Sequence, residues 1–218
     1  MKINSTAHKI RKIYSQLFPR QLIVDDRCNL HSCLTFDDGP HPKNTKKIIE
    51  ILEDHNVKCT FFLSGNAVEE NPHLVKLIHE NGHQLANHGY YHSKISDVGV
   101  QKYIQGVEKV QYLLCEITGE KIEKVFRPPY GEIKPYVFYN LISKGYQFAL
   151  WSYDSCDSYM ESSSDVFNYI KNNALRESEI ILAHEDYQQT VDVLPKILKL
   201  LKDNNHKLVT INQLLFKK

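Results

Sequence analysis

Two kinds of hydrophobic pattern alternate along most of the chain. Short, continuous apolar runs, such as 31–36 and 179–184, are typical of buried parallel strands. Between such runs, apolar residues recur every three or four positions, as on the buried face of a helix. The segment 71–82 also carries end signals, because Pro72 stands in its first turn and Gly82 just past its last. The patterns predict strands at 31–36, 58–64, 83–88, 124–127, 146–151, 179–184 and 206–211, and helices at 44–56, 71–82, 103–114, 135–145 and 194–201.

This alternation predicts an α/β fold with a parallel sheet. About seven strands in 218 residues favour a small (β/α) barrel, with an open, doubly wound sheet as the alternative. No internal repeat or linker divides the chain, so residues 31–218 are expected to form one domain behind a lead-in over residues 1–30. In either fold, chemically active side chains gather at the carboxyl ends of the strands.

The lead-in contains an amphipathic helical pattern, with Ile10, Ile13, Tyr14 and Leu17 spaced i, i+3, i+4, i+7. We expect this helix to pack on the domain, and the alternative is a peripheral contact with a membrane surface. No apolar segment approaches the roughly 20 residues of a transmembrane helix, and the basic start lacks the apolar run of a signal peptide. The sequence therefore predicts a cytoplasmic protein.

Composition narrows the choice of partner. Lys and Arg together number 27 and Asp and Glu 26, which gives a net charge of +1. Proteins that bind nucleic acid normally carry a basic excess, so the sequence predicts no nucleic-acid partner. Hydrophobic residues make up 42% and charged residues 24%, as in ordinary globular domains. Nothing in the composition predicts an oligomeric state.

Polar side chains that can do chemistry follow five of the predicted strands. If the sheet is parallel, these strand ends meet at one edge, so the side chains are expected to converge. The groups concerned are Asp37 and Asp38, His88, Arg127 and Tyr130, Asp154 and Asp157, and His184.

His88 and His92 are four residues apart, a spacing that places two imidazoles on one side of a helix or tight turn. A carboxylate from another strand end completes a set of three protein ligands with an open position, as in catalytic zinc sites. Asp37 and Asp38 can have different roles, in which one binds the cation and the other acts as a base. The plainer alternative is an Asx turn before Gly39.

The motifs TFDDGP, HGYYH, RPPYG, DSCDS and LAH stand in this order along the chain. The ordered set resembles the polysaccharide deacetylases of carbohydrate esterase family 4, also called the NodB-homology family. The family patterns are TFDDG, H-S/T-x-x-H, R-x-P-Y, D-x-x-D-W and L-x-H. The resemblance runs from about residue 32 to the C-terminus, and it implies a distorted (β/α) barrel.

The resemblance implies a metal site made of Asp38, His88 and His92. The metal implied is most often Zn²⁺, with Co²⁺ or Ni²⁺ as alternatives. Asp37 is implied to be the general base and Arg127 to hold it in place.

Further roles follow from the same resemblance. His184 is implied to be the general acid, with Asp154 orienting it. The backbone N–H of Tyr130 is implied to stabilise the oxyanion. Substrate-binding roles are implied for three residues: Leu182, which lines the acetyl pocket, Trp151 and Pro129.

The implied activity is metal-dependent removal of N-acetyl groups from N-acetylated amino sugars in an oligo- or polysaccharide. One alternative is an O-deacetylase that acts on a polymer such as acetyl-xylan, and another is a catalytically silent glycan-binding protein. Two positions depart from the family pattern. Ser158 stands where the fourth motif has Trp, which affects the shape of the acetyl pocket, and Gly89 stands at the Ser/Thr position of the second motif.

Overall fold

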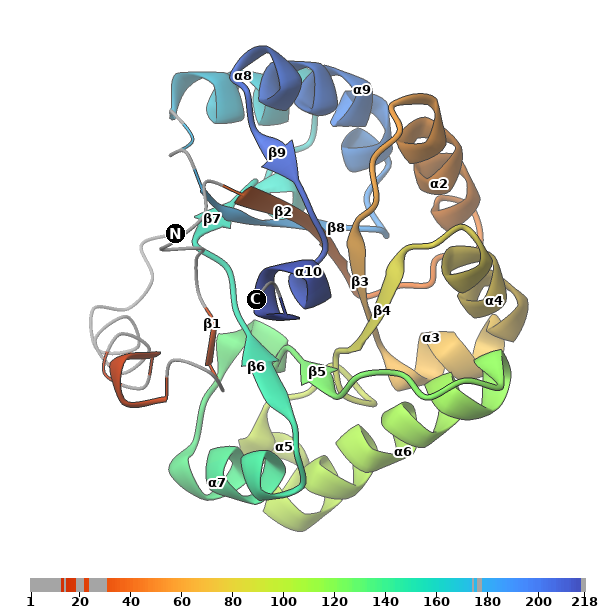
Figure 1. Cartoon of the computed structure of the whole chain (residues 1–218), viewed down its shortest axis with the longest axis vertical. Coiled ribbons are helices and arrows are strands. Elements are labelled where there is room, and N and C mark those ends of the chain that lie inside the picture. Colours follow the sequence, from red (N-terminus) through yellow and green to blue (C-terminus); the bar gives the residue numbers. More distant parts are fainter. Residues whose placement is uncertain are drawn as a thin grey trace.

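A parallel β-sheet curls into an incomplete barrel, as Figure 1 shows for the computed structural model. The structure describes residues 13, 15–18, 22–23, 31–173, 175 and 178–216. The strand order is β1-β6-β5-β4-β3-β2-β8-β7, with β9 beside β2, and every pair is parallel. The strands are β1 (Leu22–Ile23), β2 (His31–Asp37), β3 (Thr60–Leu63), β4 (Gln84–Asn87), β5 (Val125–Phe126), β6 (Gln147–Ala149), β7 (Tyr153–Asp154), β8 (Ile180–His184) and β9 (Lys207–Leu208).

Helices cover the outside of the curled sheet, whereas α10 lies inside the ring in the view of Figure 1. Two short 3₁₀ turns, η1 (Pro129–Gly131) and η2 (Asp157–Tyr159), follow β5 and β7. The α-helices are α2 (Thr45–Asp54), α3 (Gly65–Glu70), α4 (Pro72–Glu80), α5 (Ile95–Val98), α6 (Val100–Thr118), α7 (Pro135–Ser143), α8 (Ser163–Asn172), α9 (Gln188–Asp203) and α10 (Ile211–Phe216).

The predicted distorted barrel of parallel strands is confirmed, and the doubly wound alternative is not. Strands β1 and β7 stand at the two ends of the strand order, so the barrel is not closed. Besides the two-residue strands β1 and β9, seven strands make up the sheet. The sequence patterns did not predict β7, because two residues are too few to show a period of two.

Strand β2 shows how the alternation of side chains builds two apolar layers. Leu34 and Phe36 point outward and belong to the large cluster under α2 and α9. Cys33 points inward, where it packs in the barrel interior with Phe62 and Ile211. The interior is therefore a packed core. Its amino end is closed by α10, because β9 pairs with the start of β2 just before α10 begins.

The two described residues of the predicted apolar stripe in the lead-in, Ile13 and Leu17, are not buried. Ile13 and Leu17 are 52% and 66% exposed, so these two residues of the stripe do not pack on the domain. The neighbouring Phe18 makes the contact instead, with its ring 5.2 Å from that of Phe138 on α7. Most of the lead-in, including Ile10 and Tyr14, lies outside the described residues. Among the described helices, none is long and apolar enough to cross a membrane.

Truncation of Ile211 tests the closure of the barrel by α10. Its side chain is fully buried in the interior cluster, so Ile211→Ala leaves a cavity. We expect the free energy of unfolding to fall by about 2–5 kcal/mol in urea denaturation. Tyr112→Ala on the exposed face of α6 is the control, with an expected change within about 0.5 kcal/mol. Equal losses in the two variants would contradict the role given to α10.

Candidate active site

Two pairs of adjacent strands, β2 with β8 and β4 with β5, deliver the chemical groups to one end of the barrel. β2 ends on Asp37 and β8 on His184, and these two residues are paired across the parallel strands. β4 ends on Asn87, just before His88, and its partner β5 ends just before Arg127. The expected convergence of polar groups at the carboxyl ends of the strands is therefore present.

Asp38, His88 and His92 form a compact three-residue cluster. Oδ1 of Asp38 lies 3.4 Å from Nε2 of His88 and 3.3 Å from Nε2 of His92. One ligand atom from each residue lies within 4.8 Å of the other two. Nδ1 of His88 is 2.8 Å from the carbonyl oxygen of Arg127, which can only accept, so Nδ1 carries the proton. The Nε2 lone pair of His88 is then directed at Asp38.

These residues fit a divalent cation. Oδ1 of Asp38 is buried and has no hydrogen-bond partner among the described residues. It faces the Nε2 lone pair of His88, and two such acceptors repel each other unless a cation lies between them. In a tetrahedral zinc site with bonds of about 2.0–2.1 Å, neighbouring ligand atoms lie about 3.3 Å apart. The observed separations of 3.3 and 3.4 Å match this spacing.

The electrostatics of the cluster lead to the same conclusion. Burial, and then the charge of Asp37, raise the pKa of Asp38 to about 7. Burial also lowers the pKa of His88 to about 4, and that of His92 below its ordinary range. Both imidazoles are therefore neutral at physiological pH, which is the form that binds metals. A bound cation reverses the effect on Asp38 by stabilising its carboxylate.

Backbone strain is concentrated in the same motifs. Asp38, His92, Tyr130 and Cys156 have positive φ angles of 73°, 47°, 58° and 59°. Such conformations cost of order 1–3 kcal/mol each for ordinary residues and often mark functional sites. Gly89 has φ 78°, so this position favours glycine over the Ser or Thr of the family pattern.

Arg127 holds Asp37 in the floor of the site. Nη1 of the arginine donates to Oδ1 of Asp37 at 2.6 Å and to the hydroxyl of Thr35 at 2.8 Å. Nε and Nη2 donate to the carbonyl oxygens of Ala149 and Leu150, both at 3.0 Å. Arg127 is fully buried, so these bonds fix the guanidinium and leave Asp37 one preferred orientation.

Asp157, and not Asp154, orients His184. Oδ1 of Asp157 lies 2.7 Å from Nδ1 of His184, and its Oδ2 accepts from the backbone N–H of His184 at 2.7 Å and from the Thr190 hydroxyl at 2.6 Å. Asp154 instead accepts from the N–H of Cys156. The expectation for Asp154 is therefore wrong. A D-x-x-D motif offers two candidates, and only the turn at η2 shows which carboxylate meets the imidazole.

His184 carries a strongly perturbed pKa. Burial lowers the pKa of His184. The hydrogen bond and charge of Asp157, together with the charges of Asp37 and Asp38, outweigh this effect and raise the pKa to about 9. His184 is thus mostly protonated at neutral pH. The site holds a candidate proton acceptor, Asp37, and a candidate proton donor, His184, on adjacent strands.

The remaining predicted residues differ in exposure and in contacts. The Tyr130 side chain is 55% exposed, and its ring lies 4.8 Å from that of His92. Pro129 and Leu182 are buried. Leu182 stands two residues before His184 in β8, so both side chains face the barrel interior. The centre of the Trp151 ring lies 5.8 Å from the guanidinium carbon of Arg127.

Neither nearby tyrosine simply replaces the Trp missing at Ser158. The Tyr153 hydroxyl donates to the carbonyl oxygen of Asn173, and its ring packs near that of Tyr169, 6.4 Å away. Tyr153 is thereby tied to α8. Tyr159 is 63% exposed.

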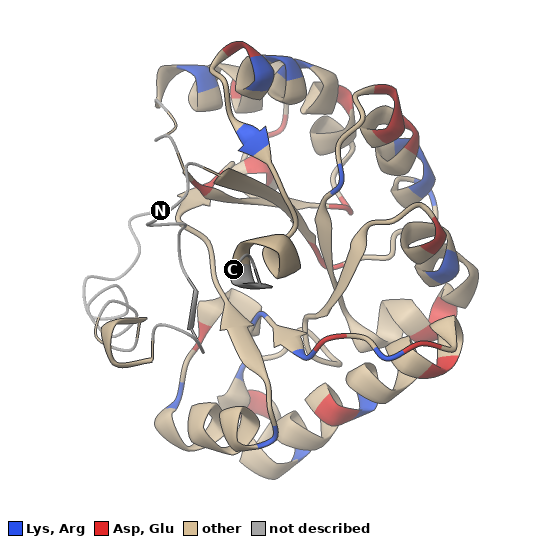
Figure 2. Cartoon of the chain, in the orientation of Figure 1, with Lys and Arg blue, Asp and Glu red and all other residues tan. Residues whose placement is uncertain are grey.

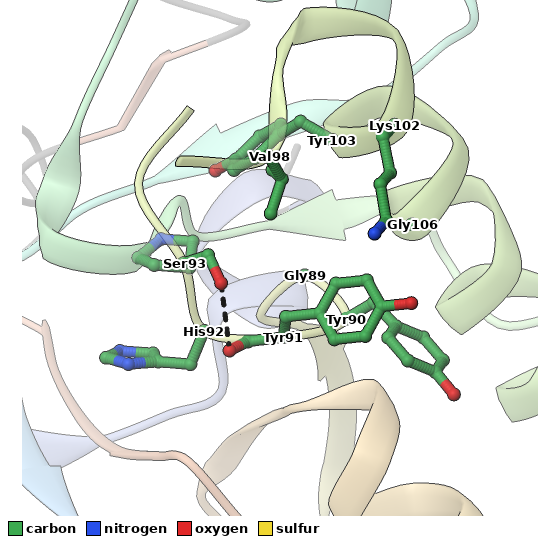
Figure 3. Close-up of a pocket in the computed structure, with 10 residues that line it drawn as sticks. Gly89, Tyr90, Tyr91, His92, Ser93, Val98, Lys102, Tyr103 and Gly106 are labelled. Carbon is green, nitrogen blue, oxygen red and sulfur yellow. Dashed lines mark hydrogen bonds between the residues drawn. The ribbon is translucent and has the colours of Figure 1, made fainter. Parts of the chain in front are cut away.

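The loop Gly89–Ser93 presents His92 to one side and two tyrosines to the other. Figure 3 shows the His92 ring pointing away from Tyr90 and Tyr91, while the Ser93 hydroxyl donates to the carbonyl oxygen of Tyr91 at 3.3 Å. The cavity between this loop and α6 has a volume of about 10 Å³. It is no larger than one water requires, so it serves loop packing and not substrate binding.

If Asp38 is a metal ligand, Asp38→Asn should gain stability in the absence of metal and lose the stabilisation by Zn²⁺. Asparagine removes a buried charge beside Asp37 and tolerates positive φ, so the metal-free variant should melt about 2–4 °C higher, the shift expected for about 1 kcal/mol. Zn²⁺ should raise the melting temperature of the native chain but not that of Asp38→Asn. Asp54→Asn on α2 is the control and should respond to Zn²⁺ like the native chain. A normal Zn²⁺ response from Asp38→Asn would contradict the assignment.

The contact between Asp157 and His184 predicts a selective change in a histidine pKa. In metal-free protein, NMR titration of His184 should give a pKa near 9. Asp157→Asn should lower this pKa by about 1–3 pH units, because it removes the opposing charge. Asp154→Asn is the matched control and should leave it close to the native value. A larger decrease of the His184 pKa in Asp154→Asn than in Asp157→Asn would instead support Asp154 as the residue that orients His184.

Comparison with known proteins identifies the family. The sequence model of the family described as polysaccharide deacetylase matches residues 27–149, more than half of the chain. A peptidoglycan-N-acetylglucosamine deacetylase of Bacillus cereus is 36% identical over 182 residues, which cover 82% of this chain and 66% of that protein. The peptidoglycan-N-acetylmuramic acid deacetylase PdaC of Bacillus subtilis is 29% identical over 196 residues, covering 90% of this chain and 41% of that protein.

A solved structure extends the comparison to the fold. The crystal structure of the Bc1960 peptidoglycan N-acetylglucosamine deacetylase, in complex with 4-naphthalen-1-yl-N-oxidanyl-benzamide, matches with a TM-score of 0.85 at 32% identity. The match covers 92% of this chain and 95% of that chain. By its sequence, its curled parallel sheet and the groups gathered at the strand ends, this chain belongs to the polysaccharide deacetylase family.

Proposed function

We propose that this protein is a metal-dependent hydrolase that removes N-acetyl groups from N-acetylated amino sugars in a glycan. One observation carries the proposal: in the cluster of Asp38, His88 and His92, a buried carboxylate oxygen has no hydrogen-bond partner among the described residues, and the cluster lies beside Asp37 and His184. A cation site flanked by a proton acceptor and a proton donor is the arrangement that amide hydrolysis requires.

Asp38, His88 and His92 would hold the metal. When bound, a divalent cation polarises the acetyl carbonyl and lowers the pKa of an attacking water. Two imidazoles and a carboxylate with an open position suit Zn²⁺, and Co²⁺ or Ni²⁺ accept the same donors.

The protein's own groups then handle the protons. Asp37, fixed by Arg127, accepts a proton from the attacking water. His184 is protonated at neutral pH because of Asp157, and it delivers this proton to the leaving nitrogen. An amine leaves readily only when protonated, so the raised pKa of His184 serves the step. The backbone N–H of Tyr130 is the candidate donor to the developing oxyanion.

The names of the relatives support an N-acetylated glycan as substrate. The matched proteins of Bacillus cereus and Bacillus subtilis are named as deacetylases of N-acetylglucosamine and of N-acetylmuramic acid in peptidoglycan. This chain spans about two thirds of the first and less than half of the second. We therefore assign the N-acetyl amino sugar as the reacting unit and leave the polymer to experiment.

Along the described outer helices, acidic and basic residues are interspersed (Figure 2). This mixed charge supports a glycan partner over a nucleic acid, which would favour a basic face.

Acetate release tests the proposed function directly. The native chain with Zn²⁺ should release acetate from N-acetylglucosamine oligomers or from peptidoglycan fragments faster than from acetyl-xylan. Asp37→Asn should lower kcat by about 10²–10⁴-fold, the usual contribution of a general base. Removal of the metal with a chelator should abolish activity and added Zn²⁺ should restore it, while Asp54→Asn stays active. Faster release from acetyl-xylan would favour the O-deacetylase alternative, and binding of glycan without acetate release would favour a silent binding protein.

A further inference from the structure

A buried carboxyl group that is not part of the proposed active site follows the end of β8. Glu185 follows His184 and is completely buried. Its backbone N–H donates to the carbonyl oxygen of Asp37 at 3.2 Å, so it continues the pairing of β8 with β2. The Glu185 carboxyl takes no part in the proposed proton transfers.

Glu185 connects β8 to the loop that leaves β2. The Thr45 hydroxyl donates to Oε2 of Glu185, and Thr45 itself accepts from the backbone N–H of His41 at 2.7 Å. The Asn44 side-chain amide donates to the carbonyl oxygen of Glu185 at 2.9 Å. The stretch 41–45, which follows the two aspartates, is therefore tied to the residue after the catalytic histidine.

The carboxyl also fills the space beside Gly39. A Cβ added at Gly39 would lie 1.7 Å from Oε1 of Glu185. The φ angle of Gly39 lies outside the left-handed region, so the backbone itself does not demand glycine. Glycine is needed at this position because Glu185 lies against it, immediately after the metal-ligand candidate Asp38.

The buried position of the Glu185 carboxyl costs folding free energy. Burial raises the pKa of Glu185 to about 8, although the hydrogen bonds from Thr45 and the His41 N–H lower it. Oε1 has no hydrogen-bond partner among the described residues. A buried polar atom without a partner costs about 1–3 kcal/mol, so an apolar side chain would serve stability alone at least as well.

We propose that Glu185 is a positioning residue that holds the loop carrying Asp37 and Asp38 against the strand end carrying His184. Through Thr45 and the backbone of Gly39, it sets where the Asp38 carboxylate meets the two imidazoles. The inference rests on the proposed metal-dependent function.

Zn²⁺ affinity, measured by calorimetry on the full chain, tests the proposal without a substrate. Glu185→Ala should weaken Zn²⁺ binding by about 10–100-fold, as for other residues that orient metal ligands. Glu185→Gln keeps the size and the acceptor for Thr45, so its affinity should stay close to native. Asp54→Ala is the control, because it removes an exposed acid on α2, and its Zn²⁺ affinity should stay close to native. Native affinity in Glu185→Ala, or an equal loss in the Gln and Ala variants, would overturn the proposal.

A double variant provides a second test, of the contact between Glu185 and Gly39. Gly39→Ala alone should lose Zn²⁺ affinity or fail to fold, because its methyl group meets the Glu185 carboxyl. Gly39→Ala with Glu185→Ala removes that obstacle, so it should regain folding and part of the affinity. A double variant no better than Gly39→Ala would show that the contact does not set the loop.

Separate readouts distinguish the two proposals. If the native chain binds Zn²⁺ and Glu185→Ala weakens this binding, but no acetate is released, the proposed function fails and the positioning role stands. If the native chain releases acetate and Glu185→Ala binds Zn²⁺ like the native chain, only the positioning role fails.

Discussion

The structure depends on how two adjacent carboxylates are accommodated at one buried strand end. Asp38 stands next to Asp37 in a setting where burial and the charge of Asp37 both raise the pKa of the Asp38 carboxyl. The chain resolves this conflict by giving them different partners. Asp37 receives a buried guanidinium at 2.6 Å, and Asp38 turns through a positive φ to face two imidazoles. Without a cation, the second arrangement leaves Oδ1 of Asp38 with no hydrogen-bond partner among the residues that the structure describes.

The fold makes this division of partners available. In a parallel sheet, each strand delivers its last residue to the same end, so residues 39 and 90 positions apart come into contact. Asp37 and His184 are paired directly, whereas His88 and Arg127 arrive from two further strands. A packed interior closed at the other end by α10 supports these groups, and proton transfer benefits from such fixed geometry.

The sequence predicted the parallel fold and the set of converging strand ends because both depend on local patterns. Apolar runs mark strands, and polar residues just after them mark one edge of the sheet. What it missed depends on packing between distant segments. The choice of Asp157 over Asp154 is made by η2 and Thr190, and the role of Glu185 by its contact with Gly39. The exposure of Ile13 and Leu17 has a related reason, since an amphipathic period does not reveal which surface will cover it.

The central claim is that one cation joins Asp38, His88 and His92. Crystals grown with Zn²⁺ and measured on both sides of the zinc absorption edge test it most directly. The account predicts one strong anomalous peak within about 2.0–2.2 Å of Oδ1 of Asp38 and Nε2 of both histidines. A fully occupied zinc elsewhere on the chain, with these three side chains empty, would contradict it.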